Sequence, residues 1–157
     1  MKRFFYYSLC IIAILAICCC TRPSETAKVY TLAPFEKPCT KDLTLCGYKT
    51  TSKGKILTKG QTSALKRIIE KKSNYRSMDS SLKTPFAPHI AFEFNENNKL
   101  KKTLLVGFNS EEWQMYSSDS LLFKSYYNCS KELLILGLSI FPNDKYLNTL
   151  YQWFVKI

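Results

Sequence analysis

Residues 89–108, HIAFEFNENNKLKKTLLVGF, carry the clearest β signal in this chain. Apolar side chains alternate strictly with others over residues 90–94, and this period of two places the apolar ones on one face of a strand. Asn97 and Asn98 are typical of a tight turn, and residues 100–108 supply an apolar return strand. The pattern therefore predicts an antiparallel β-hairpin with one apolar face.

The loop length of this hairpin determines which residue lies opposite Glu93 on the return strand. A two-residue loop places Lys102 there, and a three-residue loop places Lys101 there. Both registers pair opposite charges on the outer face of the hairpin. The charge pair therefore leaves the choice between the two registers open.

Two helices are predicted from spacing and capping. Apolar residues at helical spacing indicate an amphipathic helix over residues 63–73, with Thr62 or Ser63 as its cap. Ser130 is a cap for a second helix, which Gly137 is expected to end.

A third helix is predicted after Pro142 and Asn143, where apolar residues form a single stripe suited to core packing. Short strands are expected within residues 44–57, with a turn near residues 52–54, and within residues 121–127. Together these elements predict an α+β fold, an antiparallel sheet of about four strands packed by two or three helices.

The N-terminal segment has the layout of a secretory signal peptide. Lys2 and Arg3 precede an almost wholly apolar run over residues 4–17. We assign residues 1–19 to the signal, with a retained membrane anchor as the alternative, since a spanning helix needs about 20 apolar residues. The segment closes with three consecutive cysteines, Cys18, Cys19 and Cys20.

This segment resembles bacterial lipoprotein signals, in which an aliphatic residue at −3 and a small residue at −1 precede the cysteine that is acylated. Cys20 has Ile17 at −3 and Cys19 at −1, whereas bulky Ile17 at −1 disfavours Cys18. Cys19 has the weaker Ala16 at −3. The resemblance implies lipidation at Cys20, with Cys18 and Cys19 as alternatives, and a membrane anchor of two or more acyl chains.

The chain that follows divides into a tether and one domain. Pro23, Pro34 and Pro38 interrupt residues 20–38, in which residues 28–32 are the one strand-like piece. We expect this segment to hold the domain away from the bilayer. Residues 39–157 are then long enough for a single α+β domain with its own core.

The order of elements is similar to that in small exported proteins of the Bacteroidetes type, in which a helix precedes a hairpin that begins with Pro and His. The matching residues here are 58–69, 88–94 and 98–108. Surface-displayed lipoproteins of that type carry an acidic cluster after the acylated cysteine, and here Glu25 is the single acid. The resemblance therefore implies an outer-membrane protein that faces the periplasm. The group's cysteines around the hairpin are missing, so no metal or redox role carries over.

The charge balance concerns partners. The chain has 23 Lys+Arg against 12 Asp+Glu, and removal of Lys2 and Arg3 lowers the formal charge from +11 to +9. Membrane surfaces and other anionic envelope surfaces fit this charge, whereas an exported chain is not expected to meet nucleic acid. The densest basic cluster, a candidate anionic-surface contact and otherwise a solvated helix face, is Lys66, Arg67, Lys71 and Arg76.

Three further cysteines follow the predicted signal. Cys39 and Cys46 flank six residues, so a hairpin would bring them together as a disulfide in an oxidising compartment. Closing so short a loop would stabilise the fold by roughly 2–3 kcal/mol. Cys129 remains, either buried or paired differently, because sequence does not give connectivity.

Catalytic patterns are sparse. His89 is the single histidine, which excludes a multi-histidine metal site, and neither zinc-ligand spacing nor a phosphate-binding loop follows the signal. Two pairs are conceivable: His89 with Glu93 for acid–base chemistry, and His89 with Cys129 as a thiol–imidazole pair. We predict no cofactor and no metal.

The sequence therefore favours a lipid-anchored, non-enzymatic binding or interaction module of the cell envelope, with an envelope protein as a candidate partner. One alternative is an immunity-type inhibitor of an envelope-targeted toxin. Another is a small hydrolase or thiol enzyme that uses His89.

Overall fold

The structure is a computed structural model and describes residues 25–37, 43–76 and 84–155. The predicted signal peptide, the candidate acylation residues Cys18, Cys19 and Cys20, and also Cys39 lie outside these ranges. No helix in the described ranges is both long enough and apolar enough to cross a bilayer.

The described residues form an α+β fold with a nine-stranded antiparallel sheet and three α-helices. This confirms the predicted fold class, but the sheet has more strands than the four expected. The strands are β1 (Glu25–Ala33), β2 (Thr44–Leu45), β3 (Tyr48–Thr50), β4 (Lys55–Ile56), β5 (Tyr75–Arg76), β6 (Ile90–Glu96), β7 (Lys99–Gly107), β8 (Glu112–Ser117) and β9 (Ser120–Tyr127). The helices are α2 (Lys59–Glu70), α3 (Ser130–Ile140) and α4 (Lys145–Val155), and a 3-10 turn spans Lys72–Asn74.

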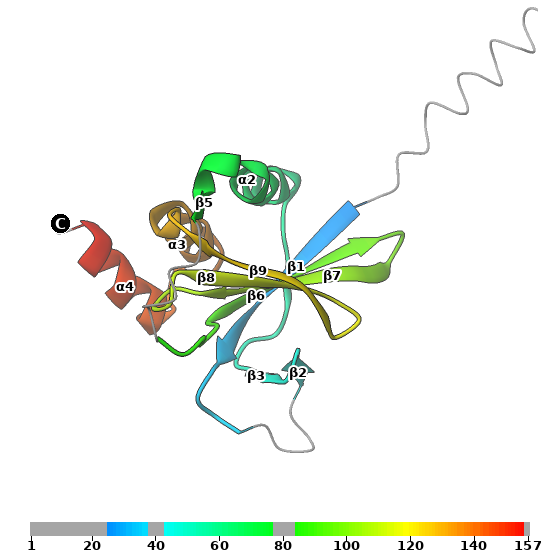
Figure 1. Cartoon of the computed structure of the whole chain (residues 1–157), viewed down its shortest axis with the longest axis horizontal. Coiled ribbons are helices and arrows are strands. Elements are labelled where there is room, and N and C mark those ends of the chain that lie inside the picture. The colour runs from blue at the N-terminus through cyan, green and yellow to red at the C-terminus, as the bar shows by residue number, and fades with distance from the viewer. Residues whose placement is uncertain (1–24, 38–42, 77–83, 156–157) are drawn as a thin grey trace, which may run out of the picture.

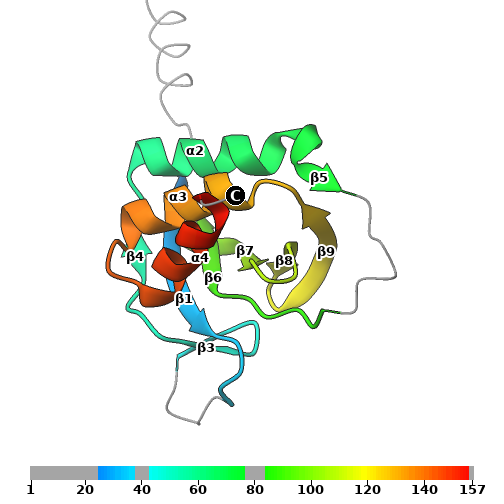
Figure 2. The same cartoon turned by 90° about the vertical axis from the view of Figure 1, so that its left-hand side faces the viewer.

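The strand order is β2-β3-β1-β6-β7-β8-β9-β5, and β4 pairs with β1 beside β3. The three helices cover one face of the sheet, and the short β2–β3 hairpin lies on the other (Figure 1). Figure 2 shows α3 between α2 and α4, in agreement with its contacts to both helices. The larger core therefore lies between the sheet and the helix layer, where Phe92, Leu104 and Trp113 are fully buried.

The predicted hairpin forms as β6 and β7. Asn97 and Asn98 both adopt positive φ, at 51° and 62°, which fits a two-residue turn between paired Glu96 and Lys99. The predicted partners of Glu93 are nevertheless wrong, because Glu93 lies opposite Thr103.

A β-bulge is the reason for this difference in register. Phe94 pairs with Lys102 while Asn95 pairs with Leu100, so Lys101 is an extra residue in β7. A bulge depends on packing against neighbouring elements, and the alternation within β6 gave no sign of it.

The largest correction concerns the predicted tether of residues 20–38. Residues 25–33 of that range form β1, an interior strand that pairs with β6 through seven residue pairs. Ala27 and Val29 are buried in the main core, whereas Leu32 is buried on the opposite face. Both faces of β1 are covered over residues 29–32, so this part of its sequence lacks the clear alternation of a half-exposed strand. The folded domain therefore includes β1.

Helix α2 begins earlier than predicted. Thr58, and not Thr62 or Ser63, is its cap, and the Thr58 side chain accepts a hydrogen bond from the Gln61 backbone N–H. The Gln61 side chain accepts one from the Thr58 N–H in return, which completes a capping box.

Helix α3 continues through Gly137, which was predicted to end it. A β-carbon at position 137 would lie 2.9 Å from Ile90 Cδ1 and 3.3 Å from Leu147 Cδ1. This glycine therefore allows close packing of α3 on the sheet and α4. The predicted Ser130 cap is also wrong, since Cys129 holds the cap position without a side-chain hydrogen bond.

Helix α4 confirms the predicted apolar stripe. Asp144 caps it by accepting a hydrogen bond from the Leu147 N–H at 3.0 Å. Leu147 is buried, and the other stripe residues, Leu150, Tyr151 and Phe154, pack against the main core.

The second face of the sheet carries a smaller apolar cluster. Leu32, Ala91 and Leu105 are buried there beneath the β2–β3 hairpin. That hairpin turns at Cys46 and Gly47, with φ of 49° and 84°, and not near residues 52–54 as predicted.

Candidate functional site

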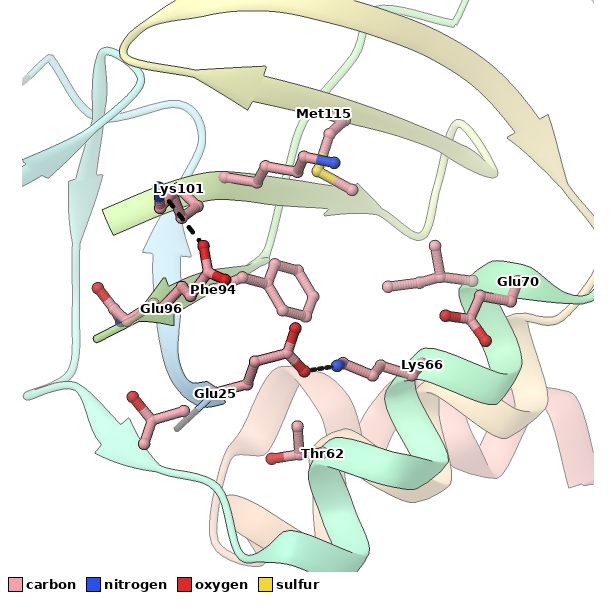
Figure 3. Close-up of a pocket in the computed structure, with 12 residues that line it drawn as sticks. Glu25, Thr62, Lys66, Glu70, Phe94, Glu96, Lys101 and Met115 are labelled. Carbon is pink, nitrogen blue, oxygen red and sulfur yellow. Dashed lines mark hydrogen bonds and ion pairs between the residues drawn. The ribbon is translucent and has the colours of Figure 1, made fainter. Parts of the chain in front are cut away.

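A cleft of about 400 Å³ opens between α2 and one end of the sheet (Figure 3). Four strands and one helix contribute to it. Its lining is Glu25 and Thr26 from β1, Phe94, Asn95 and Glu96 from β6, Lys101 and Lys102 from β7, Met115 from β8, and Thr62, Lys66, Ile69 and Glu70 from α2. We call this the α2 cleft.

The floor of the α2 cleft is apolar. Phe94 and Ile69 are partly buried and pack against the main core, and Met115 is buried within it. Figure 3 shows the Phe94 ring and the Met115 side chain pointing into the space between the strands and α2. An apolar floor of this kind binds the apolar part of a ligand by removing it from water.

The rim of the α2 cleft is charged. Lys66 forms an ion pair with Glu25 across the cleft, and Lys101 Nζ lies 3.4 Å from Glu96 Oε2. Both pairs are partly exposed, so each contributes at most about 1 kcal/mol to stability. These two ion pairs position the rim groups, but they are too weak to hold the rim rigid.

Lys102 differs from the other two lysines of the cleft. Among the described residues, no carboxylate forms an ion pair with it, although it is paired in register with Phe94 on the neighbouring strand. The Glu70 carboxylate on α2 also lacks an ion-pair partner within the described ranges. The cleft therefore has one cationic and one anionic group able to meet a ligand's charge.

The predicted basic cluster is spread over α2, its C-terminal cap and β5. Lys66 lies on the rim of the α2 cleft, whereas Arg76 lies on β5 and pairs with Glu111 at 3.0 Å. Arg67 is exposed in the last turn of α2, and its carbonyl accepts a hydrogen bond from the N–H of Lys71, the C-terminal cap. An anionic-surface contact by these residues stays a prediction.

His89 and Glu93, the predicted acid–base pair, each contact a different residue. The imidazole stacks on the Tyr146 ring at a centroid distance of 3.9 Å, and Glu93 instead accepts a hydrogen bond from Tyr30. Burial lowers the pKa of His89 to about 4, opposed only in part by the charge of Asp144 and the Ala87 carbonyl.

The predicted pair of His89 and Cys129 is not formed among the described residues. The charged side chains that influence Cys129 are Glu132 and Lys71, whereas the one that influences His89 is Asp144. Burial raises the pKa of the Cys129 thiol to about 12, which disfavours a thiolate.

Cys46 is half-buried beside the second apolar cluster and forms no disulfide with another described residue. Burial raises its pKa to about 11, with smaller effects from Asp119 and Glu93, and a hydrogen bond with Thr103 opposes the shift. Since Cys39 is not among the described residues, the Cys39–Cys46 disulfide stays a prediction. Within the described ranges no group of three or more His, Cys, Asp or Glu side chains could hold a metal ion.

Of the residues that line the α2 cleft, Lys66 alone was among the predicted site residues. The cleft joins residues from 25 to 115, and no spacing along the chain brings them together. The alternation in β6 marked Phe94 as an inward-facing residue, and this was the one available signal. Comparisons with protein-family models, curated proteins and solved structures gave no match.

Proposed function

We propose that this chain is a lipid-anchored, non-enzymatic binding module of the bacterial cell envelope, with the α2 cleft as its ligand site. Acylated Cys20 anchors it to the outer membrane, and the domain faces the periplasm. The observation that carries the proposal is the combination of an apolar floor with a charged rim beside Glu25, where the chain enters the domain.

The short stretch of chain between the anchor and the domain supports a site close to the membrane. Cys20 precedes Glu25 by five residues. Five residues span at most about 18 Å when fully extended. Glu25 itself lines the α2 cleft, so the anchor holds the cleft close to the lipid head groups.

The lining residues favour binding over covalent chemistry. The cleft supplies Phe94, Ile69 and Met115 for contact and lysines and glutamates for orientation, the usual division of labour in a ligand site. The histidine and the two described cysteines, Cys46 and Cys129, lie elsewhere in the fold.

The anchor is tested by the mass of the mature N-terminal peptide. We expect an acylated Cys20 and loss of membrane retention in Cys20→Ala. An unacylated peptide containing Cys18, Cys19 and Cys20 would contradict the anchor.

The ligand site is tested by filling the cleft. Thr62→Trp places an indole in the cleft, whereas Ser63→Trp places one on the adjacent, exposed position of α2. Native mass spectrometry of the full chain in lipid nanodiscs should detect a small molecule that co-purifies with the wild type and Ser63→Trp but not with Thr62→Trp. Identical profiles for all three proteins would contradict the assignment of the site.

A further inference from the structure

We infer that the α2 cleft binds a single-chain anionic amphiphile, with its acyl chain on the apolar floor and its carboxylate or phosphate group at Lys102. This inference rests on the proposed function, because it names the ligand class of the same cleft.

The floor selects a flexible apolar chain. Phe94, Ile69 and Met115 come from three different elements and form an uneven apolar surface. The unbranched thioether side chain of methionine adapts readily to such surfaces. A flexible acyl chain follows this surface better than a rigid ring system does.

The rim selects a negative head group and its position. Lys66 and Lys101 each have a carboxylate partner, which leaves Lys102 as the cleft cation without one among the described residues. Lys102 belongs to β7 on the strand side of the cleft, whereas Glu70 belongs to α2 on the helix side. An anionic group at the β7 side therefore meets Lys102 and stays away from the Glu70 charge.

The size of the cleft favours one chain. Its volume of about 400 Å³ is near the lower end of the range for small-molecule sites, roughly 300–1,000 Å³. A fatty acid or a lysophospholipid places one acyl chain in such a cleft, whereas a two-chain lipid would leave its second chain outside in water.

The membrane anchor places the cleft close to a source of this ligand. Because Glu25 lines the cleft and lies five residues from Cys20, the opening is held near the membrane in which such amphiphiles dissolve. Fatty acids and lysophospholipids share the chemistry that the cleft recognises, and the experiment separates them.

The test uses the acylated full chain in phosphatidylcholine vesicles and three diazirine-bearing probes: a fatty acid, the matching fatty alcohol and a lysophosphatidic acid. After irradiation, peptide mapping should place adducts of at least one anionic probe on peptides that contain Ile69, Phe94 or Met115. Lys102→Glu should lower this labelling about fivefold, since it replaces attraction with repulsion, without changing labelling by the alcohol. Lys124→Glu, which changes an exposed lysine of β9, is the matched control and should label like the wild type.

Preference for the fatty acid or for the lysophosphatidic acid identifies the head group, and either result supports the inference. Equal labelling of the cleft by acid and alcohol, unaffected by Lys102→Glu, would overturn the anionic ligand while leaving a binding cleft. Adducts spread outside the cleft would overturn the inference, and the Thr62→Trp comparison then decides separately whether the cleft binds another ligand. Unchanged thermal unfolding of Lys102→Glu, which alters an exposed side chain, shows that a loss of labelling is not a loss of fold.

Discussion

The hydroxyl of Tyr30 donates a 2.8 Å hydrogen bond to the carboxylate of Glu93. The two residues are diagonal neighbours, because Tyr30 pairs with Ala91 and Glu93 pairs with Lys28. The bond thus ties β1, which the sequence placed in a tether, to β6, the strand with the clearest signal.

Replacing Tyr30 with Phe should lower the free energy of unfolding by about 1–2 kcal/mol, because Glu93 loses a buried donor. Urea unfolding monitored by circular dichroism measures this loss. Tyr151→Phe is a matched control on α4, where no hydrogen bond of the hydroxyl is found among the described residues, and it should change stability by less than about 0.5 kcal/mol. Equal effects of the two substitutions would contradict a specific role for the Tyr30 bond.

His89 should make stability fall on acidification. Its pKa in the folded chain is lowered to about 4 by burial, opposed in part by Asp144 and the Ala87 carbonyl. An unfolded histidine titrates near 6.5, so the unfolded state binds the extra proton between about pH 6.5 and pH 4. The His89 contribution is therefore complete above about pH 6.5 and decreases by up to about 3 kcal/mol as the pH falls to 4.

This prediction is direct to measure because the chain contains one histidine. The single imidazole resonance in an NMR titration should stay in its neutral position down to about pH 5. His89→Phe, which retains an aromatic ring against Tyr146, should remove this part of the pH dependence of urea unfolding. A resonance that titrates near pH 6.5 would show that the imidazole is not desolvated.

Thr58→Ala should destabilise the fold by about 1 kcal/mol, because the capping box of α2 loses its side-chain acceptor. Gln61→Ala removes the reciprocal hydrogen bond and should have a smaller effect in the same direction. Lys59→Ala, next to the cap, should be neutral within about 0.5 kcal/mol. Thermal unfolding of the three variants tests the order, and a neutral Thr58→Ala would argue for a different start of α2.

Gly54→Ala should destabilise the protein by about 1–3 kcal/mol through overpacking. A β-carbon at position 54 would lie 2.5 Å from two ring carbons of Tyr30, and the Tyr30 ring is nearly buried and held by Glu93. Gly60→Ala is the control, since its β-carbon would approach only Thr58 Oγ1, at 4.0 Å, and alanine favours the helix. Chemical unfolding should therefore show opposite signs for the two substitutions.

The cysteines should differ in how they are protected from alkylation. Burial raises the pKa of Cys129 to about 12, so its thiol should react with iodoacetamide at pH 8 only after unfolding. If Cys39 and Cys46 are paired as predicted, Cys46 should be labelled only after both reduction and unfolding. Labelling of Cys46 in the unfolded, unreduced chain would contradict the disulfide.

The local sequence of β6 and β7 was enough to predict that they form a hairpin. Strict alternation, an Asn-Asn turn and an apolar return strand are local properties, so the hairpin was predictable, whereas its loop length was left open between two and three residues. The stripe of α4 was equally local, because apolar residues three and four apart share a helix face in any context. The same holds for the fold class, which follows from having both kinds of period in one chain.

Tertiary structure decided what depends on residues distant in sequence. Strand β1 becomes interior only because β6 pairs with it on one side and β3 and β4 pair with it on the other. Position 137 is a glycine inside a helix because Ile90 and Leu147 pack so closely against it that they leave no room for a side chain. The α2 cleft exists because Phe94 and Met115 face α2 across a gap that none of these elements fills alone. Periodicity reports how a segment orders its own side chains, whereas burial on both faces, a bulge and a cleft arise from the packing of several segments together.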